Sequence, residues 1–421
     1  MALTILPLLA TLLADPFELN AGITTEARAG QSPVLASQDS QAFMAMVATP
    51  RLEAALRDRQ TDVRLSYFPR FVWQSPNTLG RTVRPLLLNQ AALSLSSRPT
   101  ATSELGAHAF GSYGEPDYTI LPQLIGAGQG MVPVGSGQAQ VPQVQKILTF
   151  SVGVLGETAV TRRWALSLGL DASHFRPIAA PSDPNLPPPA GMFVGLIKQT
   201  AVTASPGVIH RLTAHDDLAL IVGATYATYS TGIELGLVST TLSWRARRAG
   251  SDEYRLDLGV TGARDLGEVS ALPSGRDVSP TGRVEALVHL VGEDEYGLFV
   301  RLRAAVDEFV DPILAQVYPR GLVAGQLTLV QAPDWSFGVQ GDFVTSLRTS
   351  AAPSGFDETA FSLVMHIRHR VNDNLIVEVG GRWSERAPAL AASNFGFHAQ
   401  QLWGYVSLTA DTRERPRWTG R

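Results

Sequence analysis

The chain of 421 residues contains no cysteine. It can therefore form no disulfide, no thiolate metal site and no cysteine nucleophile, and the absence is compatible with export to an oxidising compartment. Charged residues make up only 17% of the chain, below the usual ~25%. The net charge of −4 and the lack of any basic block argue against a nucleic-acid-binding protein.

Long apolar runs are also missing after the N-terminus, so the sequence predicts no transmembrane helix. The one apolar run, MALTILPLLATLLA, has the length of a signal-peptide core and ends in a small residue. We expect residues 1–14 to be a signal peptide that is cleaved on export. Because the basic residues that usually precede such a core are lacking, a buried N-terminal helix is the alternative.

The chain is rich instead in apolar and polar residues that alternate with a period of two. In the stretch DWSFGVQGDFVTSL, Phe337 and Val339 lie on one face of a strand, and Gln340 and Asp342 lie on the other. A soluble sheet turns its apolar face to a core. A membrane barrel instead turns its apolar face to lipid and its polar face to an inner lumen.

The same alternation recurs almost to the C-terminus, with only a weak helical period around 305–317. No linker separates domains, so we expect one barrel over residues 15–411, followed by a periplasmic tail at 412–421. The pattern predicts about eighteen strands, with sixteen left open, at 17–29, 42–57, 60–74, 84–97, 102–114, 144–157, 162–175, 191–213, 216–230, 232–248, 252–264, 280–292, 295–307, 321–332, 334–347, 357–370, 374–386 and 398–411.

The connections between these strands alternate in length. Counted from the first strand, the odd connections are long, including one at 308–320, except for a tight turn at Ser230–Thr231; the even connections are short and polar. Short periplasmic turns and long extracellular loops are typical of outer-membrane barrels. We therefore predict an all-β fold, a single transmembrane antiparallel up-and-down β-barrel in the outer membrane of a Gram-negative bacterium. A soluble multi-domain β protein is the alternative.

Aromatic residues give an independent test, because amphipathic rings prefer the membrane interface. Trp73 and Trp383 fall at the ends of strands next to long loops, and the others fall at the ends next to short turns. The predicted interface girdle consists of Trp73, Trp164, Trp244, Trp335, Trp383, Tyr254 and Tyr296.

If the apolar face of each strand meets lipid, the polar face lines the lumen. This face carries many charged residues, which must be hydrated or paired. A mild excess of arginine favours an anionic solute; cross-strand pairing that merely stiffens the wall is an equally weighted alternative. The predicted lumen-facing residues are Glu18, Glu26, Arg28, Arg64, Arg70, Asp171, Arg255, Asp257, Arg283, Glu285, Arg301, Arg303, Asp342, Arg368, Glu378 and Arg382.

No enzymatic, metal or cofactor site is predicted. His366 and His369 lie on opposite faces of one strand and cannot share a metal ion. Ser362 and His366 share a face but are about 13 Å apart along an extended strand, too far for a nucleophile and its base. The glycines of the long loop 115–143 lack the strand-to-helix context of a phosphate-binding loop. That loop either folds over or into the pore or is a plain surface loop.

Four segments resemble a known group of proteins: DPFELNAGITTEARAGQSP, RLSYFPRFVWQSPN, RPLLLNQAALSLSS and GSYGEPDYTIL. Together they resemble outer-membrane barrel proteins of myxobacterial type. More loosely, the chain is similar to the eighteen-stranded barrels proposed to partner polysaccharide-export proteins in Wzx/Wzy-type secretion. The C-terminus departs from the usual barrel-insertion pattern, because TRERPRWTGR follows the last strand.

The resemblance implies an outer-membrane conduit that secretes a polysaccharide together with a periplasmic export protein. A general or solute-selective diffusion porin, and a plugged barrel with a structural or adhesion role, are the alternatives. The expected partners are outer-membrane lipid and lipopolysaccharide, the periplasmic export protein, and the translocated polysaccharide or small solute, with no nucleic acid among them.

Overall fold

The computed structural model describes residues 17–33, 40–75, 85–115, 146–178, 198–230, 232–248, 252–267, 277–291, 297–311, 316–347, 358–388 and 399–412. The predicted signal peptide, the tail beyond Thr412, the loop 115–143 beyond Glu115 and Tyr296 of the predicted girdle all lie outside these residues. No helix in the described part of the chain is long and apolar enough to cross a membrane.

The described chain is almost entirely β-strand, as the period-two pattern predicts. The strands are β1 (Phe17–Pro33), β2 (Ser40–Arg57), β3 (Thr61–Tyr67), β4 (Arg70–Ser75), β5 (Leu86–Thr100), β6 (Ser103–Gly114), β7 (Lys146–Ala159), β8 (Trp164–Ile178), β9 (Gln199–Arg211), β10 (Asp216–Tyr229), β11 (Glu234–Arg247), β12 (Glu253–Asp265), β13 (Asp277–Val291), β14 (Gly297–Asp311), β15 (Gln316–Ala332), β16 (Trp335–Ser346), β17 (Glu358–Asn372), β18 (Leu375–Pro388) and β19 (Ala399–Asp411).

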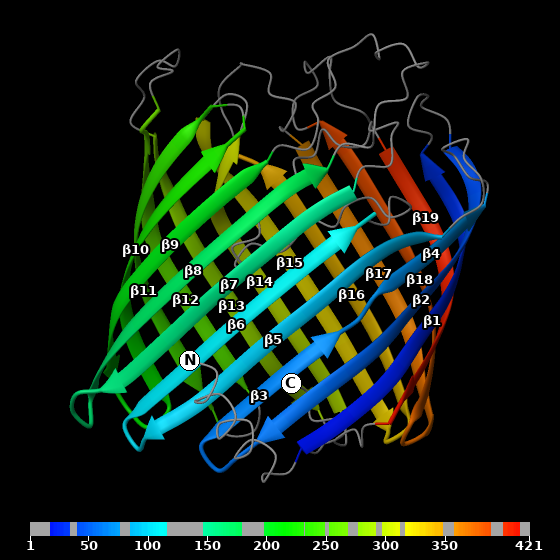
Figure 1. The fold of residues 1–421 in the computed structure, drawn as a ribbon, viewed down its shortest axis with the longest axis horizontal. Helices are drawn as coiled ribbons and strands as arrows, with labels where there is room; N and C mark the ends of the chain where they lie inside the picture. The colour runs from blue at the N-terminus through cyan, green and yellow to red at the C-terminus, as the bar shows by residue number, and fades with distance from the viewer. Residues whose placement is uncertain are drawn as a thin grey trace, which may run out of the picture.

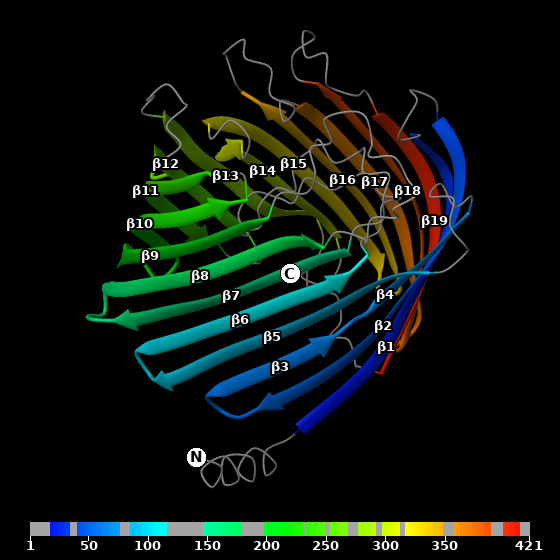
Figure 2. The same cartoon turned by 45° about the horizontal axis from the view of Figure 1, so that its top comes forward.

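The strands form one closed antiparallel barrel (Figures 1 and 2). Each strand pairs with the next along the chain, and the last strand returns to the first. β1 pairs with β19 from Gly22 opposite Asp411 to Gln31 opposite Leu402. Closure removes the free edges that an open sheet would expose. The predicted up-and-down barrel is therefore confirmed.

β3 and β4 are two pieces of a single barrel strand. β2 pairs with β3 at Leu52–Tyr67 and with β4 at Met44–Ser75, a step of eight residues on both sides, so no residue is inserted between the pieces. The ladder breaks at Pro69, which has no N–H to donate. Counting the pair as one strand gives eighteen strands among the described residues, and the alternative of sixteen is wrong.

The short connections lie together at the lower edge in Figure 1, where β1 begins, as the alternation of lengths predicts. One expectation about the long connections is wrong. The connection expected at 308–320 is only 312–315, because β14 and β15 run on, and the described parts of the weak helical period, 305–311 and 316–317, are strand as well. Asp307 and Arg320, at the two ends of the expected connection, lie opposite each other in the ladder.

The buried residues of this barrel do not form a hydrophobic core between two layers. Small buried clusters lie along the wall, such as Ala305, Leu322 and Val344, which are direct partners across β14, β15 and β16. Most large apolar side chains are exposed instead, among them Leu19, Met44, Leu166, Leu258 and Val323. A soluble protein rarely exposes so much contiguous apolar surface. Lipid is the solvent that this surface fits.

The middle of β16 allows a direct test of which face meets lipid. Val339 belongs to the exposed apolar face, so Val339→Arg should destabilise the folded barrel by about 2–4 kcal/mol near the bilayer midplane. Urea titration of the protein folded into liposomes, followed by heat-modifiable gel mobility, measures this loss.

The matched control is Gln340→Arg, which places the same charge one residue away on the other face and should fold as the wild type does. Asp342→Asn should also assemble normally. A result in which Gln340→Arg is the damaging variant would mean that the assigned faces are reversed.

Candidate functional site: the inner wall of the barrel

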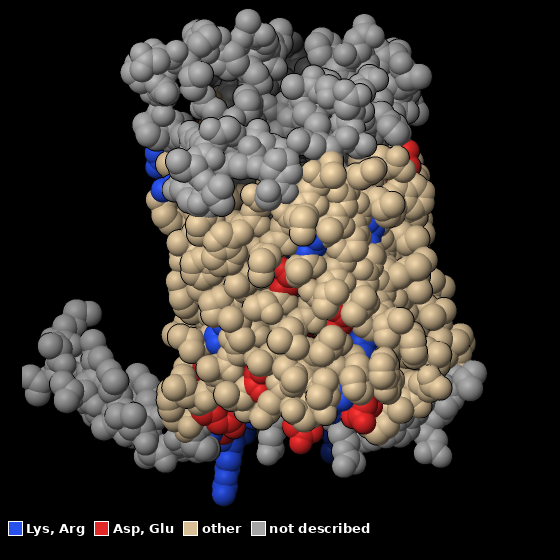
Figure 3. Space-filling view, turned by 90° about the vertical axis from the view of Figure 1, so that its right-hand side faces the viewer, with Lys and Arg blue, Asp and Glu red and all other residues tan. Residues whose placement is uncertain are grey.

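The strand pairing shows which residues share a face of the barrel wall, because directly opposed residues in neighbouring strands point to the same side. Glu26 on β1 lies opposite Ser407 on β19, which lies opposite Glu378 on β18, and Glu378 lies opposite Arg368 on β17. The opposite face carries the exposed Leu, Val, Met and Phe side chains. Figure 3 shows one side of that outer wall as a largely uncharged surface.

An apolar outer face and a polar inner face identify the solvent on each side. The fold is an outer-membrane β-barrel. Barrels of this size enclose water rather than a packed interior, so the inner wall is the candidate functional surface. The register places all sixteen predicted lumen-facing residues on this inner face, from Glu18 on β1 to Arg382 on β18. Their role in conduction stays a prediction.

Six of the seven predicted girdle residues are described, and all six lie on the outer face. Trp73 and Trp383 lie toward the long connections, and Trp164, Trp244, Trp335 and Tyr254 lie toward the short turns. Two of the lower tryptophans also pack against histidines directly across the ladder. The ring centroids of Trp164 and His210 are 4.2 Å apart, and those of Trp335 and His369 are 4.1 Å apart.

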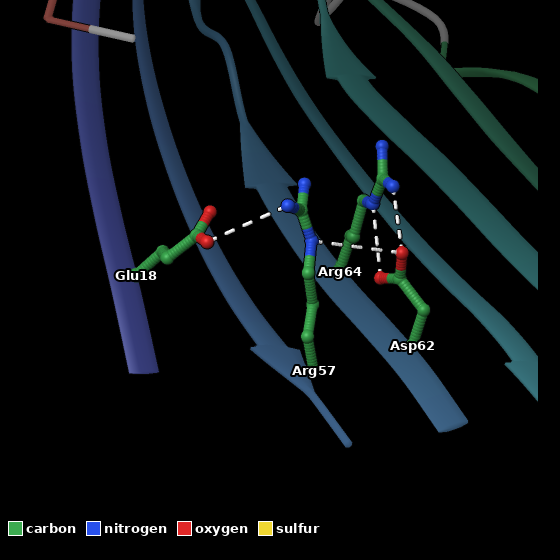
Figure 4. A network of polar contacts seen from close by, with 4 residues as sticks. All are labelled: Glu18, Arg57, Asp62 and Arg64. Carbon is green, nitrogen blue, oxygen red and sulfur yellow. Dashed lines mark hydrogen bonds and ion pairs between the residues drawn. The ribbon is translucent and has the colours of Figure 1, made fainter. Parts of the chain in front are cut away.

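Near the short turns, the inner charges of β1–β3 form a paired network (Figure 4). Arg64 donates from Nε and Nη2 to the two carboxylate oxygens of Asp62, at 3.0 and 2.6 Å. Arg57 joins Asp62 at 3.8 Å and Glu18 at 3.4 Å, which links three neighbouring strands. Bidentate arginine–carboxylate pairs hold both side chains in a defined geometry. The network therefore fixes the wall at this rim.

A second group of charges, which we call the arginine sector, covers the inner face of β11–β15. Arg255 pairs with Asp257 at 2.8 Å, and Arg301 pairs with Glu285 at 2.5 Å. The side chain of Arg301 nevertheless stays 59% exposed to the lumen. The sector consists of Arg245, Arg247, Arg255, Arg283, Arg301, Arg303 and Arg320, with Glu253, Asp257, Glu285 and Asp307 as the carboxylates among them whose side chains the structure describes.

A third group lies where β17, β18 and β19 meet β1. Arg368 donates to Glu378 at 2.7 Å, and the Tyr405 hydroxyl donates to the other carboxylate oxygen at 2.8 Å. The Tyr405 ring packs over Gly380, where an added Cβ would approach it to 2.6 Å. The Arg28 guanidinium lies 5.0 Å from the centre of the Trp403 ring, within cation–π distance. Arg28 also pairs with Glu26.

The wall across the lumen from the arginine sector has a different chemistry. Figures 1 and 2 show β6–β8 on the near wall and β13–β16 on the far wall. On β6–β9 the inner face of the described residues is mostly Ser, Thr, Gly and small apolar side chains, and its one arginine, Arg211, sits at the short-turn rim. Hydroxyls there bond to each other, as Ser112 does to Thr149. We call this surface the hydroxyl sector.

One charged pair lies in the middle of the hydroxyl sector, away from the pair that Arg211 forms with Glu157 at the short-turn rim. His108 Nε2 on β6 lies 3.7 Å from Asp171 Oδ1 on β8, and the strand between them places Gly153 at the crossing point. A Cβ at Gly153 would come within 2.2 Å of the Asp171 oxygen and 2.3 Å of the His108 ring. Glycine is thus needed there for the two side chains to meet across β7. Both side chains remain more than half exposed.

The structure brings no catalytic group together among the residues considered. The Ser362 hydroxyl donates to Asp342 Oδ1 at 3.1 Å rather than to His366. Within the described ranges, no three His, Cys, Asp or Glu side chains are placed to hold a metal ion. Ion pairing accounts for part of the charge on the wall, as the stiffening alternative expects, and it leaves the exposed arginines facing the lumen.

Sequence reasoning missed several inner residues. Trp403 and Tyr405 lie on the inner face, although aromatic rings were expected at the outer rims. The alternation in the sequence already indicated this, because Trp403 and Tyr405 lie on the opposite face of the strand from Leu402 and Val406. Arg245 was missed because the alternation around 232–247 is blurred, and only its pairing opposite Arg255 fixes its face.

Comparisons with known proteins identify no family: no family model matches the chain, and no curated protein matches it. Solved structures are similar at low identity. The outer-membrane protein OpdK of Pseudomonas aeruginosa gives a TM-score of 0.45 at 12% identity, covering 94% of this chain and 99% of that chain. A BenF-like porin of Pseudomonas fluorescens gives 0.44 at 9% identity, with 94% and 99% covered. OccAB4 of Acinetobacter baumannii gives 0.45 at 7% identity, with 94% and 98% covered.

Similarity at this level says nothing about what the chain transports. Neither the myxobacterial resemblance nor the polysaccharide-export partnership finds support in these structures.

The hydrogen bond from Tyr405 to Glu378 should be measurable in a double-mutant cycle. Tyr405→Phe removes the donor, and Glu378→Ala removes the acceptor. Because hydrogen bonds to charged groups exceed neutral ones, we expect a coupling energy of about 1–2 kcal/mol in the free energy of unfolding. Tyr254→Phe, on the outer face, serves as the control and should be additive with Glu378→Ala. Additivity for Tyr405 as well would contradict the bond.

Proposed function

We propose that this protein is an outer-membrane channel for small polar solutes that favours anions. The observation that carries the proposal is the uneven inner wall, where a surface rich in arginine faces a surface rich in hydroxyls across a barrel of eighteen strands. Within the arginine sector, seven arginines lie on the inner face of five neighbouring strands. A solute that carries an anionic group and hydroxyls can contact both walls during passage.

Pairing does not cancel this cationic character. Arg301 is 59% and Arg255 is 31% exposed even though each has a carboxylate partner. An exposed guanidinium keeps donors that its partner does not use, since it carries five N–H groups. Rings and ladders of charged side chains set the selectivity of water-filled pores. The paired arginines therefore both stabilise the wall and present positive charge to a passing solute.

This proposal replaces the polysaccharide conduit as the main hypothesis. The conduit rested on the resemblance of the N-terminal segments, and no feature of the described wall favours a polymer or a periplasmic partner. The two functions separate in planar bilayers. A diffusion channel conducts when the purified protein is added alone, whereas an export conduit stays closed without its partner, and a plugged barrel passes nothing.

Neutralising one or the other charge of a single ion pair tests the selectivity. Arg301→Gln should lower the ratio of anion to cation permeability, and Glu285→Gln should raise it. A unit charge about 8 Å from an ion in water contributes about 0.5 kcal/mol, with opposite sign for an anion and a cation, which corresponds to about a fivefold change in the ratio. Reversal potentials in a salt gradient measure both ratios.

The two variants break the same 2.5 Å contact, so damage to the wall alone would change both ratios in the same direction. Shifts of opposite sign support the proposal. A closed wild-type channel, or shifts of the same sign, would overturn it.

A further inference from the structure

The chain contains only two lysines, Lys146 and Lys198, and the barrel brings them to one place. Lys146 begins β7, and Lys198 directly precedes β9. Between them runs β8, which presents Arg176 near the end of the strand. Leu148 of β7 lies opposite Arg176, and Phe175 of β8 lies opposite Gln199 of β9. One further step of the second register puts Lys198 opposite Arg176.

These three residues, which we call the basic triad, lie on the outer face of the barrel. They share the phase of Leu166, Leu168 and Leu170 on β8, whose side chains are about half exposed. All three basic residues are exposed. In the described register, opposed residues have Cβ atoms about 5 Å apart and diagonal neighbours about 7–8 Å apart. The triad thus places three cations within reach of one anionic group.

The triad sits directly above the apolar surface. Below it lie Phe150 on β7, Leu170 on β8 and Val202 on β9, each 48–51% exposed. Between the two levels, the His174 ring and the Thr200 hydroxyl hydrogen-bond to each other at 2.8 Å. The change from apolar to polar to cationic side chains follows the change from acyl chains to headgroups at a membrane surface.

The triad also differs from five basic residues at the opposite rim. Near the short turns, Arg57, Arg98, Arg211, Arg247 and Arg248 each have a carboxylate within 4 Å. Among the described residues, no ion pair joins any member of the triad to a carboxylate.

The nearest carboxylate in the register, Glu115, is 5% exposed and follows β6. Like charges placed opposite each other are destabilising, so the triad calls for an external anion.

We propose that the basic triad binds the phosphates of a phosphorylated glycolipid of the lipid A type in the outer leaflet. The long connections mark this rim as the extracellular one, where such lipids form the membrane surface. The acyl chains would lie on Phe150, Leu170 and Val202, which a free phosphate would not contact. The proposal depends on the orientation of the barrel and is independent of the solute that the lumen carries.

The test uses the full-length protein in phosphatidylethanolamine nanodiscs that contain bisphosphorylated lipid A or the same lipid without its phosphates. Native mass spectrometry measures the affinity for each lipid. Each basic residue near an anionic membrane surface contributes about 1 kcal/mol. We therefore expect K146Q/R176Q/K198Q to bind bisphosphorylated lipid A on the order of 10²-fold more weakly than the wild type. Removal of the phosphates should weaken binding to the wild type by a similar factor.

Two control variants keep the result interpretable. R98Q/R162Q/R163Q removes three exposed arginines at the short-turn rim and should bind lipid A as the wild type does. K146R/K198R keeps the charges and should also bind normally, which separates loss of the site from loss of folding. Equal binding by K146Q/R176Q/K198Q would overturn the proposal. Displacement of the lipid by millimolar inorganic phosphate would also overturn it, because it would indicate a free-anion site.

Discussion

The structure depends on the requirement that every backbone N–H and C=O within a bilayer find its partner inside the protein. An open sheet fails this requirement at its two edges, and so β1 must return to β19. The ten paired positions between Gly22–Gln31 and Leu402–Asp411 close the barrel. The break at Pro69 is tolerated because the pairing on both sides of it keeps the same register, so the wall remains continuous there.

Closure also separates two solvents. Once the sheet is closed, alternate residues of every strand face lipid, and the residues between them face the lumen. This explains how a chain with little charge can carry so many arginines and carboxylates on one surface: the lumen keeps them hydrated, and pairs such as Arg368–Glu378 hold their geometry. The same closure leaves large apolar side chains exposed where a soluble protein would have a core.

The two walls of the lumen differ because their strands come from different parts of the chain. Strands β6–β9 supply hydroxyls and glycine, and β11–β15 supply arginine. Antiparallel pairing in chain order keeps each group together as a sector. The outer surface is organised in the same way, since the basic triad draws on three consecutive strands. The proposed selectivity inside and the proposed lipid contact outside therefore rest on the same pairing.

The sequence by itself determined most of the strands, their approximate number, the face that most residues take and the rim at which the long connections lie. These follow from period-two alternation and connection length, which are local properties. Where an expected connection proved to be strand, as at 308–320, or where alternation was blurred, as around Arg245, the local signal failed. Only the tertiary structure decided which charges meet. Lys146 and Lys198 are 52 positions apart, and His108 lies 63 positions from Asp171. Such contacts are set by the stagger between strands, which hydrogen bonding around the whole closed sheet fixes and no single strand encodes.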